Sequence, residues 1–133
     1  MQYRHLGHSG LKISEIGLGG WLTFGHVHDQ HSGREVIDRA VASGVNFFDT
    51  ANVYAGGDCE TMWGRLLAGH PRSSYVLATK VYFPMGEGPN DRGLSRKHVV
   101  EGTEAALERV RAQVTGMQES SDLLDIVVTM RSE

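Results

Sequence analysis

The sequence VNFFDTANVY, residues 45–54, combines a short strand with two polar side chains that can carry chemistry. Its first five residues are rich in β-forming side chains and end on Asp49, which is typical of a strand that opens into a loop. Tyr54 follows in that loop, and a second β-rich segment, residues 75–79, ends directly before Lys80. Chemistry gathers at the carboxyl ends of parallel strands, so we expect Asp49, Tyr54 and Lys80 to meet there.

Strand and helix patterns alternate along the rest of the chain. A β-hairpin with its turn at residues 8–10 is predicted for residues 1–14. Strands are then expected at residues 16–20, 45–49, 75–79 and 123–129, and helices at residues 32–44, 59–68 and 95–110. This α/β alternation predicts a parallel sheet with helical crossovers. Two architectures fit the pattern, a doubly wound open sheet and part of a (β/α) barrel.

The composition indicates one ordinary globular domain. The chain has 133 residues, 40% hydrophobic and 22% charged, with a net charge of -3, so a basic surface for nucleic acid is not expected. Cys59 is the one cysteine, which excludes an intrachain disulfide and favours a reducing compartment. The first ten residues have no apolar signal sequence, and no apolar run could span a bilayer. A cytoplasmic protein without membrane insertion is therefore expected.

The three polar side chains suit proton transfer to a carbonyl oxygen. A tyrosine hydroxyl is a weak acid, with an unperturbed pKa of about 10. A lysine ammonium nearby favours the phenolate, and a carboxylate paired with the lysine keeps it charged and in place. Asp49, Lys80 and Tyr54 could together form a tuned general acid. Spacing alone also allows a plainer interpretation, in which the aspartate caps a turn and the tyrosine packs.

Several motifs favour the catalytic interpretation. Residues 46–54 (NFFDTANVY) resemble the signature of the aldo-keto reductase family, whose aspartate and tyrosine belong to a catalytic tetrad. Residues 78–80 (ATK) resemble the strand that supplies the tetrad lysine, and residues 3–14 resemble the hairpin that closes the bottom of that barrel. Residues 19–25 and 92–98 resemble sequences of one branch of this family, which includes the potassium-channel β-subunits.

The resemblance implies a fold. It predicts a partial (β/α)8 TIM barrel of aldo-keto reductase type, with about the first four β/α units preceded by an N-terminal hairpin. Residues 1–133 would form the N-terminal half of this barrel, family-like over 1–110 and divergent over 111–133.

The resemblance also implies an activity, the reduction of aldehydes or ketones to alcohols by hydride transfer from NADPH. Tyr54 would be the general acid, Lys80 its modulator and Asp49 the partner of Lys80. Gly20 and Trp21 match positions that contact NADP(H) near the nicotinamide, beside Asp49 and Lys80. The implied partner is a small carbonyl substrate.

Two departures from the family pattern affect these expectations. If residues 122–131 form the fourth strand, Met130 takes the place of the tetrad histidine, and a methionine cannot donate a hydrogen bond to a carbonyl oxygen. A complete barrel also needs about 250 residues, so we expect a truncated chain that is inactive alone. The alternative is a non-catalytic regulatory or binding protein resembling a potassium-channel β-subunit.

Two further expectations concern assembly and metals. The unpaired edges of strands 16–20 and 123–129 would allow a homo-oligomer. No metal site is expected, because His26, His28 and His31 lack the fixed spacing of a ligand set and suit a solvated loop better.

Overall fold

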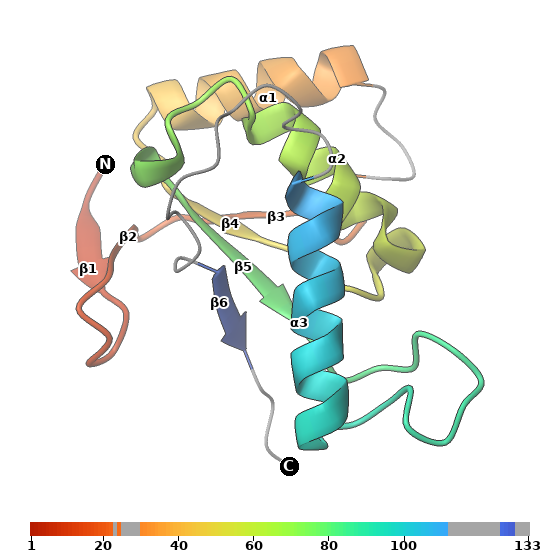
Figure 1. The fold of residues 1–133 in the computed structure, drawn as a ribbon. Helices are drawn as coiled ribbons and strands as arrows, with labels where there is room; N and C mark the ends of the chain where they lie inside the picture. Colours follow the sequence, from red (N-terminus) through yellow and green to blue (C-terminus); the bar gives the residue numbers. More distant parts are fainter. Residues whose placement is uncertain (23, 25–29, 112–125, 130–133) are drawn as a thin grey trace.

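The computed structural model describes residues 1–22, 24, 30–111 and 126–129. These ranges contain a two-stranded antiparallel hairpin and a four-stranded parallel sheet in the order β3-β4-β5-β6 (Figure 1). The hairpin strands are β1 (Tyr3–His5) and β2 (Lys12–Ser14), and the parallel strands are β3 (Leu18–Gly19), β4 (Phe47–Asp49), β5 (Val76–Lys80) and β6 (Ile126–Thr129). The predicted alternation and the parallel sheet are confirmed.

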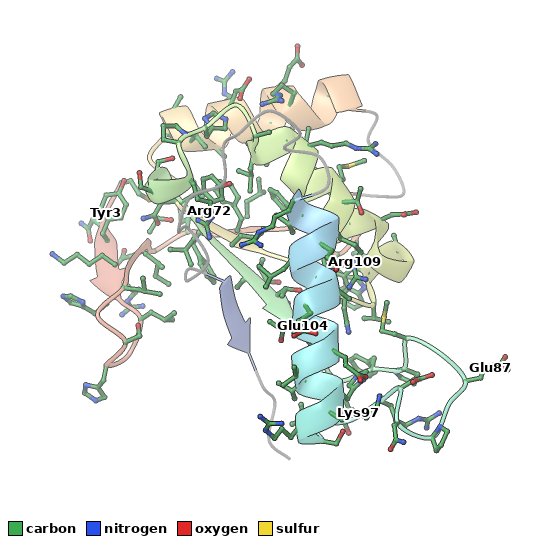
Figure 2. The ribbon with its side chains drawn as sticks, in the orientation of Figure 1. Tyr3, Arg72, Glu87, Lys97, Glu104 and Arg109 are labelled. Atoms are coloured by element: carbon green, nitrogen blue, oxygen red, sulfur yellow. The ribbon has the colours of Figure 1, made fainter. Side chains whose placement is uncertain are left out.

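The N-terminal hairpin is confirmed and is tied to the rest of the molecule by Tyr3. Arg4 pairs with Ile13 across the hairpin, and Gly10 has the positive φ of 82° that its turn requires. The hydroxyl of Tyr3, which Figure 2 labels, donates to the carbonyl of Gly44 at 2.8 Å. This bond joins the hairpin to the turn that leads into β4.

Within the described part of the chain, three α-helices pack on the sheet, with α2 between α1 and α3 (Figure 1). They are α1 (Gln30–Ala42), α2 (Asp58–Leu67) and α3 (Arg96–Arg111), and two 3-10 turns, η1 (Tyr54–Gly57) and η2 (Arg72–Ser74), lie before α2 and β5. The start of α3 agrees with the prediction, because the Ser95 hydroxyl accepts a hydrogen bond from the His98 amide at 3.1 Å.

The core lies between the sheet and the helices. Its centre is Trp63 of α2, whose ring lies 4.7 Å from that of Phe24 and 5.3 Å from that of Phe48, centroid to centroid. Ile37 of α1 and Leu77 of β5 complete this apolar layer. Burial of these large side chains, at about 25 cal/mol per Å² of apolar surface, holds the helices on the sheet.

The packing of α3 follows the expected pattern in part. The sequence predicts an inward stripe of Val99, Thr103, Ala106, Leu107 and Val110, and of these Ala106 is fully buried and Val110 packs against the core. His98, which is not part of that stripe, is buried as well. Gly102 lies close to Val81, the residue after β5, because an added Cβ there would lie 2.8 Å from it. A glycine contributes no apolar side chain, so hydrophobic spacing could not indicate this contact.

The sheet is open in the described residues. β3 pairs only with β4 and β6 only with β5, so these two strands are its edges. The backbone of β6 confirms a fourth parallel strand, although residues 123–125, Met130 and Arg131 lie outside the described residues. Among the described residues, no helix has both the length and the apolar character that crossing a membrane requires.

Candidate active site

The sheet register brings Asp49 and Lys80 together at the carboxyl ends of β4 and β5. Asp49 pairs with Ala78 in the parallel ladder of β4 and β5, two residues before Lys80. Two amides continue the ladder beyond β4, since Thr50 donates to the carbonyl of Ala78 at 2.8 Å and Asn52 donates to that of Lys80 at 3.2 Å. The carboxyl ends of both strands are thus fixed to each other.

The side chains of Asp49, Tyr54 and Lys80 converge at these strand ends. The Lys80 ammonium donates to Asp49 Oδ2 at 2.7 Å, to the carbonyl of Thr50 at 2.7 Å and to the Tyr54 hydroxyl at 3.4 Å. Lys80 Nζ also lies 5.0 Å from the centroid of the Tyr54 ring. The convergence expected from the sequence is therefore present, and the three acceptors fix the direction of the ammonium.

This group of polar side chains is open to solvent on one side. Of the Lys80 and Asp49 side chains, 36% and 34% respectively are exposed. The ion pair is consequently partly screened by water, and Tyr54 beside it is half-buried. A phenol donor beside a fixed ammonium can hydrogen-bond to, and protonate, an oxygen that becomes negatively charged.

A strained turn carries Tyr54 into α2. Ala55, Gly56 and Gly57 follow it with φ values of 50°, 64° and 104°. Among the described residues, Ala55 is the one residue other than glycine with positive φ, and such a conformation costs an alanine roughly 1–2 kcal/mol. Backbone strain of this kind concentrates at functional sites.

Trp21 lies beside the tyrosine. It is 64% exposed and its ring stacks on that of Tyr54, with centroids 6.1 Å apart and planes 20° from parallel. The preceding Gly20 is buried, and an added Cβ there would lie 2.6 Å from Trp63 Nε1 and 2.8 Å from Cys59 Sγ. The close approach of the Gly20 backbone to α2 therefore fixes the place of Trp21.

Thr50 and Cys59 lie beneath the site and were not predicted to take part. The Thr50 hydroxyl donates to Cys59 Sγ at 3.2 Å, and the thiol donates to the carbonyl of Gly20 at 3.5 Å. Burial raises the pKa of the Cys59 thiol, although the hydrogen bond from Thr50 opposes that shift. Cys59 is thus a buried, neutral thiol with a packing role.

Glu60, whose carboxylate is fully buried in the first turn of α2, was also not predicted. It accepts hydrogen bonds from the Thr79 hydroxyl and from Arg109 Nε, at 2.5 and 2.6 Å. The only sign of Glu60 in the sequence is its place near the start of a helix. Glutamates there usually lie at the surface, where they interact favourably with the helix dipole.

Over the described ranges, no group of three or more His, Cys, Asp or Glu side chains could hold a metal ion. His26 and His28 lie outside these ranges.

Comparison with known proteins identifies the family of this chain. Residues 15–118 match the Aldo/keto reductase family. The chain belongs to this family. The resemblance found in its motifs, including the similarity to potassium-channel β-subunits, is therefore confirmed.

Three relatives share closely similar names. The chain is 47% identical over 112 residues to a probable voltage-gated potassium channel subunit beta of Arabidopsis thaliana, covering 83% of this chain and 34% of that protein. A protein of the same name from Oryza sativa subsp. japonica is 45% identical over 83% of this chain and 34% of its own length. A putative voltage-gated potassium channel subunit beta of Schizosaccharomyces pombe is 46% identical over 81% of this chain and 33% of its length. The chain thus spans about a third of these relatives.

Proposed function

We propose that this chain is the N-terminal part of an NADP(H)-dependent reductase that converts aldehydes or ketones to alcohols, with Tyr54 as the general acid. Membership of the aldo/keto reductase family supports an oxidoreductase. The observation that carries the proposal is the contact of Lys80 Nζ with both Asp49 Oδ2 and the Tyr54 hydroxyl, at 2.7 and 3.4 Å.

Each residue has a distinct part in this proposal. Tyr54 donates a hydrogen bond to the carbonyl oxygen of the substrate and gives up its proton as negative charge develops there. The Lys80 ammonium beside it stabilises the phenolate that remains. Asp49 holds Lys80 beside Tyr54, and the carbonyl of Thr50 assists it.

The exposed residues of the site fit a nicotinamide cofactor. The Trp21 ring is exposed and stacks beside the proton donor, so an aromatic surface lies within reach of Tyr54. Trp21 would contact the cofactor, with Gly20, Asp49 and Lys80 bordering the same place. When bound, NADPH supplies the hydride that reaches the carbonyl carbon.

The parallel sheet with helical crossovers supports a place in a larger barrel. In this proposal β3, β4, β5 and β6 are the first four strands of a (β/α)8 barrel, and the hairpin β1–β2 closes its bottom. Residues 1–133 form one unit, family-like to about residue 110 and divergent beyond. Because the chain spans about a third of its relatives, we expect it to be inactive without the remaining strands.

A hybrid protein provides the test. The matched residues of this chain replace those of the Arabidopsis relative, which supplies the rest of its own chain. Oxidation of NADPH on addition of an aldehyde, together with formation of the alcohol, is the expected result. A folded hybrid that binds NADPH and yields no alcohol would refute the proposal.

The names of the relatives favour a second candidate, a regulatory subunit of a potassium channel. In this case the Tyr54 site would bind cofactor without needing turnover. Co-purification of the hybrid with a channel, unchanged by Tyr54→Phe, would favour this function, and the aldehyde assay separates it from the first.

A further inference from the structure

Glu60 is a buried charge outside the group formed by Asp49, Tyr54 and Lys80. Its exposed fraction is 0%, and a carboxylate in such a place needs full compensation. Oε1 accepts a hydrogen bond from the Thr79 hydroxyl at 2.5 Å, and Oε2 accepts one from Arg109 Nε at 2.6 Å. Both oxygens are therefore satisfied, one by the sheet and one by α3.

The contact with Thr79 acts on the strand that carries Lys80. Thr79 directly precedes Lys80 in β5, and successive side chains of a strand point to opposite faces. Thr79 thus points to the helix layer and is held there by Glu60, while Lys80 points to the other face. The carbonyl of Lys80 is held along the strand by the Asn52 amide at 3.2 Å.

The contact with Arg109 acts on the turn that carries Tyr54. Figure 2 labels Arg109 on α3. Its side chain crosses to the start of α2 and covers Gly57, where an added Cβ would lie 2.8 Å from Arg109 Cδ. Gly57 is the last residue of the turn that begins at Tyr54. Glu60 and Arg109 therefore touch both segments that position the proton donor and its lysine.

We infer that Glu60 and Arg109 are positioning residues, which hold the carboxyl end of β5 and the turn after Tyr54 in the arrangement that directs Lys80 at Tyr54. The catalytic meaning of this inference rests on the proposed function. The positioning itself is a property of the chain and can be measured without turnover. A purely structural role would lower stability and leave Lys80 as fixed as before.

The lysines of the chain provide a direct readout, since there are only three, Lys12, Lys80 and Lys97. Selective ¹³C labelling at lysine Cε gives one set of NMR signals for each. A lysine held in one direction shows two separate Hε signals, while a freely rotating lysine shows one averaged signal. We expect separate signals for Lys80 and an averaged signal for the exposed Lys12.

The informative variants are Thr79→Val, which removes the hydroxyl at nearly constant volume, and Glu60→Gln. Thr79→Ser retains the hydroxyl and should restore the unmodified spectrum. Glu101→Gln is the matched control, because it neutralises a carboxylate that pairs with Lys97 on the exposed side of α3. It should change the Lys97 signals alone.

The expected result is loss of the separation between the two Lys80 Hε signals in Thr79→Val and Glu60→Gln, with Lys12 unchanged. The inference is overturned if the separation persists in folded Thr79→Val, or if Lys80 gives an averaged signal in the unmodified chain. If Glu60→Gln does not fold, Thr79→Val decides alone. An inactive hybrid protein in which Lys80 still responds would reject the proposed function and retain the positioning role.

Discussion

At the scale of single residues, the site depends on how Lys80 is held. Its three N–H donors go to a carboxylate, a backbone carbonyl and a phenol, supplied by Asp49, Thr50 and Tyr54. Two of these acceptors lie at the end of β4 and the third on a strained turn. The direction of the Lys80 ammonium therefore depends on how the end of β4 and the turn after Tyr54 are placed relative to each other. An arginine could not replace it, because a planar guanidinium directs its donors differently.

The strain at Ala55 has a measurable consequence. Ala55→Gly should stabilise the folded chain by about 0.5–1 kcal/mol, because relief of the left-handed alanine exceeds the extra freedom of glycine in the unfolded state. The matched control is Ala68→Gly at the end of α2, where φ is -57° and glycine should destabilise the chain by a similar amount. Urea denaturation followed by circular dichroism measures both, and a destabilised Ala55→Gly variant would contradict the assigned strain.

Residue types with a specific chemical role were predictable, and buried supporting residues were not. Asp49, Tyr54 and Lys80 stand at predicted strand ends, where a parallel sheet brings polar side chains together. Glu60 escaped prediction because its partners, Thr79 and Arg109, are distant in sequence, and charge spacing along one helix cannot indicate a buried ion pair.

At the scale of elements, α2 is the support of the site. It carries Cys59 and Trp63 under Gly20, and Glu60 under β5. Its crossing with α3 is close, because an added Cβ at Gly64 would lie 2.2 Å from the carbonyl oxygen of Val110. The two backbones can approach in this way only where one residue has no side chain.

This crossing predicts a strong effect of a small substitution. Gly64→Ala should destabilise the chain by about 1–3 kcal/mol, since the rigid backbone of α3 must move to admit one methyl group. Gly33→Ala is the control, because in α1 the new Cβ would meet side-chain atoms alone, the nearest being a Leu66 methyl at 3.1 Å, and alanine favours the helix. Equal effects of the two substitutions on the urea midpoint would refute the close crossing.

The helices and strands were predictable in kind and in order, but their closest approaches were not. Hydrophobic spacing located α3 and the inward side of its Ala106 and Val110. It did not indicate the contact between Gly102 and Val81, because a glycine has no side chain to count. The strand predicted for residues 16–20 is observed over Leu18–Gly19, and the Gly20 amide still donates to the carbonyl of Asp49 in β4 at 2.9 Å.

At the scale of the whole molecule, the described sheet has two edges, β3 and β6 (Figure 1). Unpaired backbone groups at such edges favour pairing with another chain. The exposed aromatic and aliphatic side chains of Trp21 and Leu22, at 64% and 69%, add apolar surface next to β3. In a complete barrel the edge strands would be paired and no edge would remain.

We therefore expect the isolated chain to self-associate. Sedimentation velocity over a range of protein concentrations should show a mass above the 14.6 kDa of one chain, rising with concentration. Arg4→Glu in the hairpin, which is not part of this sheet, should leave the mass unchanged. A compact monomer at every concentration would contradict the incomplete-barrel proposal.

The most direct test of the account compares Tyr54 with phenylalanine in the hybrid protein. Tyr54→Phe removes the proton donor and keeps the ring that stacks on Trp21. We predict that kcat for aldehyde reduction falls by about 10²–10⁴-fold, because general acid catalysis is lost, while the Kd for NADPH, measured by fluorescence quenching, stays the same. Undiminished kcat in a folded Tyr54→Phe hybrid would contradict the assignment of Tyr54 as the acid.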